Sequence, residues 1–223
     1  MIMSLQMEQR DWNELPVHCL VEVFGRVGIE SLVETCPLVC KSWYEATFYP
    51  QCWEQLVFTK SPSLRSSKHP IPRLILDKDS WSDCCLVVPL DQTKYADESF
   101  EKFVKFAIGR SHGLVTAIVF HPKSLLKEGQ IAWIAQRCPS LKLLVLPSYL
   151  SYVINFEVSN SICNWKDLEA LQIASLIGLK KTIANIGCQE LEQLDVSKFK
   201  GVAGDHEIQE LASRICVFKH EGS

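Results

Sequence analysis

The segments LKLLVLPS (residues 141–148) and LEALQIAS (residues 168–175) share one spacing of apolar residues, L-x-x-L-x-L, in which isoleucine replaces the last leucine of the second. Two further segments fit the spacing, LVTAIVFHP from Leu114 and LEQLDVSK from Leu191. The four segments start 27, 27 and 23 residues apart. One such match arises often by chance, but four at nearly constant spacing indicate a structural repeat.

The pattern predicts which residues of each repeat face the core. They are Leu114, Ala117 and Val119; Leu141, Leu144 and Leu146; Leu168, Leu171 and Ile173; and Leu191, Leu194 and Val196. Only Ala117 is undersized for this role. A fifth, degenerate copy follows in ICVFKH, where Ile215 and Phe218 keep the spacing.

Helical patterns precede several of these segments. In EGQIAWIAQRCPS, residues 131, 134, 135 and 138 share one apolar face, and in DHEIQELASRI residues 208, 211, 212 and 215 do the same. Cys138 and Cys188 each lie three residues before a predicted strand, which favours a structural role for both thiols. A 23–27-residue unit of strand and helix with this leucine spacing is a leucine-rich repeat. Because one repeat cannot cover its own leucines, neighbours are expected to stack into a solenoid with a parallel sheet on the concave face.

Composition limits the class of protein. The chain has 223 residues, 47% of them hydrophobic, which is ordinary for a globular protein with a real core. A formal charge of −3 argues against nucleic acid as a partner. Residues 1–15 lack the features of a secretory signal, and no run of about 18 apolar residues predicts a membrane span. We therefore expect the cytoplasm, the nucleus or both, with most of the ten cysteines as buried thiols.

An apolar helix is predicted at LPVHCLVEVF, residues 15–24. Pro16 suits a first helical turn, and Leu20, Val23, Phe24 and Val27 recur at offsets of three and four residues. Three short helices in about 45 residues are too small a unit to bury all of their apolar side chains. The surplus is expected to be covered by a partner, or alternatively by the third helix and the first strand of the solenoid.

Residues 15–58 resemble an F-box, whose usual form is L-P-x-x-I-L-x-x-I-F, a short helix, V-C-r-x-W and a later tryptophan. The matching residues, which the resemblance implies bind an adaptor, are Leu15, Pro16, Leu20, Val23, Phe24, Leu32, Val39, Cys40 and Trp43; Trp53 matches the later tryptophan. Cys19, His18 and Ser31 depart from the usual residues, which implies at most a weaker adaptor interface. Residues 11 to about 200 are similar to plant F-box/leucine-rich-repeat proteins.

The predicted fold class is α/β, with a three-helix F-box followed by a short leucine-rich-repeat solenoid. The predicted domains are an F-box at 11–58, a linker with an irregular first repeat at 59–98, and leucine-rich repeats at 99–220. The 59–98 segment begins TKSPSLRSSKHPIPR, a basic, serine- and proline-rich run that is typical of a solvated connector and also suits phosphorylation or docking. The chain stops soon after its last weak repeat, which suggests truncation or an edge that pairs with a partner.

The residues between the template leucines are expected to lie on the concave face. Its predicted substrate-binding residues are an apolar patch of Ile118, Phe120, Leu143 and Val145, and the polar residues Gln172, Gln193 and Asp195. A contiguous apolar patch of this kind seldom stays bare on a monomer. The alternative is that the 59–98 segment folds over it.

Catalytic signatures are not found in the sequence. G-x-S-x-G, G-x-G-x-x-G and P-loop motifs are missing, and no cysteine and histidine spacing suggests zinc. We expect neither a cofactor nor a metal. Ser124 is expected at a loop or helix start.

The F-box resemblance implies a non-catalytic substrate receptor of an SCF-type cullin–RING ubiquitin ligase, which binds a Skp-type adaptor and, through it, cullin and RING subunits. The first alternative is a repeat-based interaction scaffold that acts outside a ligase. A small-molecule receptor ranks lower, because four or five repeats make too short an arc to enclose a ligand. The sequence does not identify the protein substrate.

Overall fold

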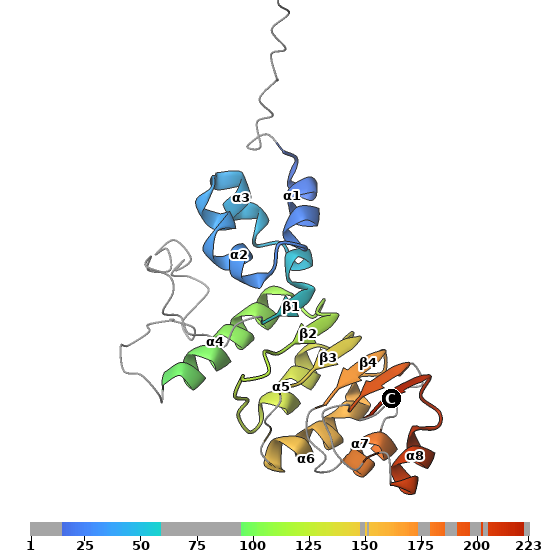
Figure 1. The fold of residues 1–223 in the computed structure, drawn as a ribbon. Helices are drawn as coiled ribbons and strands as arrows, with labels where there is room; N and C mark the ends of the chain where they lie inside the picture. Colours follow the sequence, from blue (N-terminus) through green and yellow to red (C-terminus); the bar gives the residue numbers. More distant parts are fainter. Residues whose placement is uncertain are drawn as a thin grey trace, which may run out of the picture.

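The computed structural model describes residues 15–58, 95–147, 150, 152–173, 179–185, 191–196, 202 and 205–220. They form a group of short helices at the N-terminal end, joined to a parallel sheet that carries helices along one side (Figure 1). The predicted mixed α/β class is therefore confirmed. No helix within these ranges is both long enough and apolar enough to cross a membrane.

The N-terminal helical unit contains α1 (Val17–Phe24), α2 (Ile29–Glu34) and α3 (Lys41–Ala46), with the 3-10 turns η2 (Cys36–Leu38) and η3 (Pro50–Trp53). Pro16 stands immediately before α1, where its missing N–H leaves no hydrogen bond unmade. Gly28 has a φ of 81°, a left-handed conformation that glycine adopts without a Cβ clash, and it immediately precedes α2. The chain can therefore turn sharply between α1 and α2.

Within the described ranges, six parallel strands form one sheet in chain order. They are β1 (Gln55–Val57), β2 (Ala117–Val119), β3 (Leu143–Val145), β4 (Ala170–Gln172), β5 (Gln193–Asp195) and β6 (Val217–Lys219). The middle residues of the first five strands pair in register and are at most 1% exposed. We call this set the inner row: Leu56, Ile118, Leu144, Leu171 and Leu194.

Helices cover the inner row from one side of the sheet (Figure 1). They are α4 (Tyr95–Arg110), α5 (Gln130–Arg137), α6 (Tyr152–Ser161) with the turn η5 (Ile162–Asn164), α7 (Leu179–Asn185) and α8 (His206–Ala212). From α5 to α8, each helix packs against the next. The predicted apolar face at 131–138 is confirmed, and on α8 Ile208 and Ala212 are buried. Cys138 is fully buried as expected, and burial raises the pKa of its thiol to about 12; Cys188 lies outside the described residues.

The first predicted repeat is wrong by one residue. The sequence pattern placed three of its residues against the core: Leu114, Ala117 and Val119. The structure instead buries three others, each at most 1% exposed: Val115, Ile118 and Phe120. Pairing of Ile118 with Leu144 fixes this register, and Leu114 is 41% exposed. In a strand, a shift of one residue moves every side chain to the opposite face.

The two ends of the sheet also follow the repeat spacing. At the N-terminal end, Trp53, Leu56 and Phe58 are buried, and Leu56 pairs with Ile118 in the neighbouring strand. At the other end, Phe218 pairs with Leu194, so the fifth predicted copy is confirmed as a strand. Strand β1 lies within the range predicted as the N-terminal domain, and α4 begins inside the predicted 59–98 segment. The domain boundaries stay predictions.

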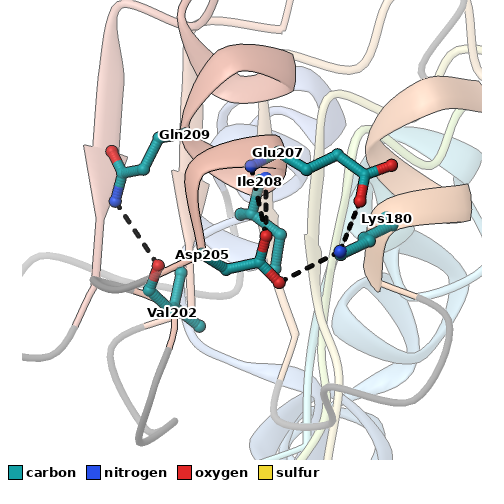
Figure 2. A network of polar contacts seen from close by, with 6 residues as sticks. All are labelled: Lys180, Val202, Asp205, Glu207, Ile208 and Gln209. Carbon is teal, nitrogen blue, oxygen red and sulfur yellow. Dashed lines mark hydrogen bonds and ion pairs between the residues drawn. The ribbon is translucent and has the colours of Figure 1, made fainter.

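A polar network joins the last two helices, α7 and α8 (Figure 2). The Asp205 side chain accepts hydrogen bonds from the backbone N–H groups of Glu207 and Ile208, which caps the start of α8. Lys180 Nζ on α7 lies 3.1 Å from Asp205 Oδ2 and also contacts the Glu207 carboxylate. Hydrogen bonding to Lys180 lowers the pKa of Asp205, and hydrogen bonding to Glu207 and Asp205 raises the pKa of Lys180. The network therefore ties two successive units together at the surface.

We expect Asp205→Ala to lower the urea midpoint of unfolding more than Asp205→Asn, because asparagine keeps the cap and loses only the charge. Wild type should have a higher urea midpoint than Asp205→Asn at pH values above the ordinary aspartate pKa. This difference in midpoint should disappear as the pH falls through the lowered pKa of Asp205 in the folded protein. Urea titrations monitored by circular dichroism at several pH values measure this. Equal midpoints for the two variants would contradict the capping role.

Candidate functional site

The N-terminal helical unit buries apolar side chains that belong to the one core running through the chain. Leu20 and Phe24 on α1 and Leu32 on α2 are 1–2% exposed. The Phe24 and Trp43 rings pack edge to face, with centroids 5.1 Å apart. The prediction that Leu20, Phe24 and Leu32 contact an adaptor is therefore corrected, because their side chains already fill the interior of this chain.

Apolar side chains remain at the surface of the same unit. Val23 and Val39, both predicted to bind an adaptor, are 47% and 49% exposed. Val27 and Leu38, which the prediction left out, are 36% and 54% exposed. We call these four residues the N-terminal apolar face: Val23, Val27, Leu38 and Val39. The alternative that the third helix and the first strand cover every apolar side chain is wrong for Val23 and Val39.

The remaining predicted adaptor residues lie at intermediate or exposed positions. Pro16 is exposed, and Leu15, Cys40 and Trp43 are half-buried. Helix α1 packs against α3, so the two helices belong to one packed unit (Figure 1). Val27 lies three residues beyond the end of α1, and the apolar spacing read from the sequence already included it with Leu20, Val23 and Phe24.

Trp53 and α4 connect this unit to the sheet. Trp53 is 2% exposed, and its indole Nε1–H donates to the Thr47 carbonyl over 2.8 Å. Its ring meets Phe106 of α4 edge to face at 5.4 Å. The Arg110 guanidinium lies over the Phe48 ring at 4.2 Å, and burial lowers the pKa of Arg110. We call these residues the aromatic junction: Phe48, Trp53, Phe106 and Arg110.

The aromatic junction surrounds a small cavity and continues into the sheet. The cavity has a volume of about 20 Å³, room for about one water molecule, and is also lined by Leu32 and Tyr44. Beyond it, Phe58 stacks on Phe120 with centroids 5.5 Å apart and meets Phe100 of α4 edge to face. The helical unit and the first two strands therefore share one continuous aromatic core.

The open face of the sheet lies opposite the inner row. The prediction that Ile118 and Phe120 belong to an apolar patch on this face is wrong, because they are 0% and 1% exposed and point into the core. Leu143 and Val145 flank the buried Leu144 in β3, and both are half-buried. They therefore lie on the open face. The register places Ala117 beside Leu143 and Val119 beside Val145. With Val57 beside Val119, these residues form the open-face apolar patch: Val57, Ala117, Val119, Leu143 and Val145.

The predicted polar residues of this face lie together on β4 and β5. Gln172 pairs with Asp195 in register, and Gln193 lies beside Ala170. All three predicted polar side chains are half-buried. Lys142 and Glu169, one position before the strands, form an ion pair of 2.6 Å. The alternative that the 59–98 segment covers this face concerns residues that lie mostly outside the described ranges.

The grouping of metal-ligating side chains and the position of Ser124 are both defined in the parts of the chain that the structure describes. Within them no group of three or more histidine, cysteine, aspartate or glutamate side chains is placed to hold a metal ion. Ser124 is 2% exposed in the segment between β2 and α5, so its hydroxyl is withdrawn from solvent.

Comparison with known proteins agrees with this geometry. The F-box-like family model matches residues 12–59, the range that contains the N-terminal helical unit and β1. The N-terminal helical unit is therefore an F-box-like domain. The chain is also 25% identical to an F-box/LRR-repeat protein of Arabidopsis thaliana, over 84% of this chain and 56% of that protein.

A second curated relative is the F-box protein FBW2 of the same plant, 25% identical over 95% of this chain and 59% of that protein. The chain thus spans somewhat more than half the length of the curated relatives it matches. These matches confirm the resemblance to plant F-box/leucine-rich-repeat proteins.

The face assignment of β2 predicts that Ile118→Ser and Val119→Ser differ sharply. We expect Ile118→Ser to lower the free energy of unfolding by about 2–5 kcal/mol, because it leaves a cavity and buries a hydroxyl. For half-buried Val119→Ser, we expect a loss of about 1 kcal/mol or less. Urea denaturation of both variants measures the difference. A larger loss for Val119→Ser would restore the register predicted from the sequence.

The aromatic junction predicts that Phe106→Ala destabilises the protein by about 3–5 kcal/mol, because it removes the ring that contacts Trp53 and Arg110. As a matched control, Leu125→Ala removes an apolar side chain that is 55% exposed, and we expect a change within about 0.5 kcal/mol. Tryptophan fluorescence during denaturation reports on the junction directly. Equal effects of the two substitutions would show that the junction contributes no stability.

Proposed function

We propose that this chain is a substrate-recognition subunit of an SCF-type cullin–RING ubiquitin ligase. The F-box-like helices dock a Skp-type adaptor, and the adaptor links the chain to cullin and RING subunits. The strand-and-helix units form a leucine-rich-repeat solenoid whose open face holds the target protein. The observation that carries the proposal is an F-box-like match at residues 12–59, the range whose helices expose the N-terminal apolar face.

Surplus apolar surface supports the docking step. Leu20, Phe24 and Leu32 are buried in the interior of the chain, whereas Val23 and Val39 stay about half exposed. Several exposed apolar side chains on one small unit are typical of a protein that binds a partner there. Burial of about 800 Å² per partner at about 25 cal/mol per Å² leaves net affinity after the entropic cost of association.

The fixed position of the F-box-like helices relative to the sheet supports a receptor role without catalysis. The aromatic junction holds the F-box-like helices against the sheet, so a target on the open face would keep a fixed position relative to the adaptor. Ubiquitin transfer is then performed by other subunits through proximity. The proposed substrate-binding residues on this face are Leu143, Val145, Gln172, Gln193 and Asp195, and the proposed sites of action are the cytoplasm and the nucleus.

The docking step is tested with Val23→Asp and Val39→Asp against a purified plant Skp-type adaptor. Each change places a carboxylate on the N-terminal apolar face, so we expect adaptor affinity to fall by about tenfold or more. Unfolding midpoints should change little, because both side chains are about half exposed. Size-exclusion co-elution and titration calorimetry measure the binding.

Leu125→Asp is the matched control, since it puts the same charge on an exposed apolar residue outside this face. It should leave adaptor binding intact. Wild-type protein that stays folded but does not co-elute with adaptor would refute the proposal. Recovery of adaptor without cullin would instead favour a scaffold that acts outside a ligase.

A further inference from the structure

Helix α4 is the part of the helical layer that lies next to the N-terminal helices. In Figure 1 it runs between these helices and α5, and it packs closely against the turn η3. The side chains at this contact are Trp53 and Phe106, whose rings meet edge to face. Contact at a single turn fixes the position of the N-terminal helical unit better than its orientation. The orientation therefore depends on a second contact with α4.

Arg110 at the end of α4 makes such a second contact. Its guanidinium carbon lies 4.2 Å from the centre of the Phe48 ring and 5.3 Å from the centre of the Phe106 ring. Phe48 follows α3, and its ring packs edge to face on Tyr44 of that helix with centroids 4.8 Å apart. The guanidinium therefore links a ring of the N-terminal helical unit to a ring of α4.

The backbone that carries Arg110 is firmly held. Ile108 and Ser111, on either side of it, are 2% and 0% exposed. The Ser111 hydroxyl donates a hydrogen bond to the Ile108 carbonyl over 2.7 Å. A cation is also favourable at the C-terminal end of a helix. The guanidinium thus meets the Phe48 ring from a fixed base.

Packing beside this contact is incomplete. The cavity of about 20 Å³ lies between Leu32 and Pro37 of the helical unit and Phe106 and Arg110 of α4. Side chains on opposite walls of an unfilled space make no mutual contact that would hold them in place. A planar guanidinium that stacks on aromatic rings has a preferred geometry, so the Arg110 contact resists a shift that the cavity would permit.

We propose that Arg110 is a positioning residue that fixes the orientation of the F-box-like helices relative to the sheet, through its contacts with Phe48 and Phe106. This inference rests on the proposed function, because the orientation matters when the helices hold an adaptor and the sheet holds a target. Without the Arg110 contact, the two bound partners would be presented over a range of angles. Fewer of these arrangements would bring the target to the site of ubiquitin transfer.

Pulsed electron paramagnetic resonance on the full chain tests the inference. Ketone-bearing residues introduced at the exposed Glu45 of α3 and Glu210 of α8 carry the two spin labels, so the native cysteines stay unlabelled. We expect one narrow distribution of label distances in the otherwise unchanged chain. Arg110→Ala should make it about twofold wider, because the cation–ring contact is lost. Equal widths would overturn the proposal.

A second label pair shows where the motion arises. Gln136 on α5 and Glu210 on α8 are both exposed and both lie in the helical layer of the sheet. The distance distribution between labels at these two positions should be the same with and without Arg110→Ala. Widening of this distribution as well would overturn the proposal, because the whole solenoid would then have loosened.

Further variants separate orientation from stability. Arg110→Lys keeps the charge without the planar group, so we expect an intermediate width for the Glu45 and Glu210 pair. Phe48→Leu removes the ring from the other side of the contact and should widen the distribution as Arg110→Ala does. The double variant should be no wider than either single variant, and additive widening would refute the contact as the cause.

Ile131→Val is the matched control for stability. It shortens a fully buried side chain of α5 away from the aromatic junction, so it should lower the urea midpoint and leave the width unchanged. Equal widening by Ile131→Val and Arg110→Ala would overturn the proposal, because loss of stability alone would then explain the effect.

Adaptor co-elution of the same variants separates the two proposals. Arg110 is not part of the N-terminal apolar face, so Arg110→Ala should co-elute with adaptor as the wild type does. If adaptor binds and Arg110→Ala leaves the width unchanged, the inference fails while the proposed docking function stands. If Arg110→Ala widens the distribution and the wild type does not bind adaptor, the ligase assignment fails and the positioning role of Arg110 stands.

Discussion

Burial of the inner row is the constraint on which the rest of the structure depends. Each of the first five strands is only three residues long and contributes one fully buried central side chain, so no strand and helix pair can shield that side chain from water by itself. Stacking aligns Leu56, Ile118, Leu144, Leu171 and Leu194 in adjacent strands and places their helices side by side. The parallel sheet and its strand order both follow from this requirement.

The aromatic junction extends the same core into the N-terminal helices. Trp53 belongs to the helical unit through its hydrogen bond to Thr47 and to the sheet through its contact with Phe106. Because β1 begins two residues after Trp53, the last turn of the helical unit leads straight into the sheet. A partner bound to the F-box-like helices and one bound to the open face would thus be held by a single packed body. Such coupling suits a receptor that must present its target at a defined position.

The two candidate surfaces arise from side chains that the shared core does not use. On α1, Leu20 and Phe24 turn inward, which leaves Val23 exposed. On the sheet, the alternation of side chains that buries Leu144 directs Leu143 and Val145 to the opposite face. Both surfaces contain apolar residues because a mainly apolar helix or strand buries only one of its faces and leaves the apolar side chains of the other face exposed. Their position on one connected body makes them candidates for two simultaneous partners.

By itself, the sequence determined the repeat, the parallel sheet and the F-box-like helices, because the spacing of leucines and the L-P and V-C motifs directly reflect periodic burial. Contacts between distant segments decided the rest. The segment LVTAIVF is apolar at consecutive positions, so its spacing fitted two registers, and only pairing of Ile118 with Leu144 and stacking of Phe120 on Phe58 selected one. Likewise, the sequence pattern assigned Leu20, Val23 and Phe24 alike to a partner interface. Only packing against Trp43 of α3 and against η3 determined that Leu20 and Phe24 are inside and Val23 outside, because burial depends on three-dimensional neighbours that a linear pattern does not contain.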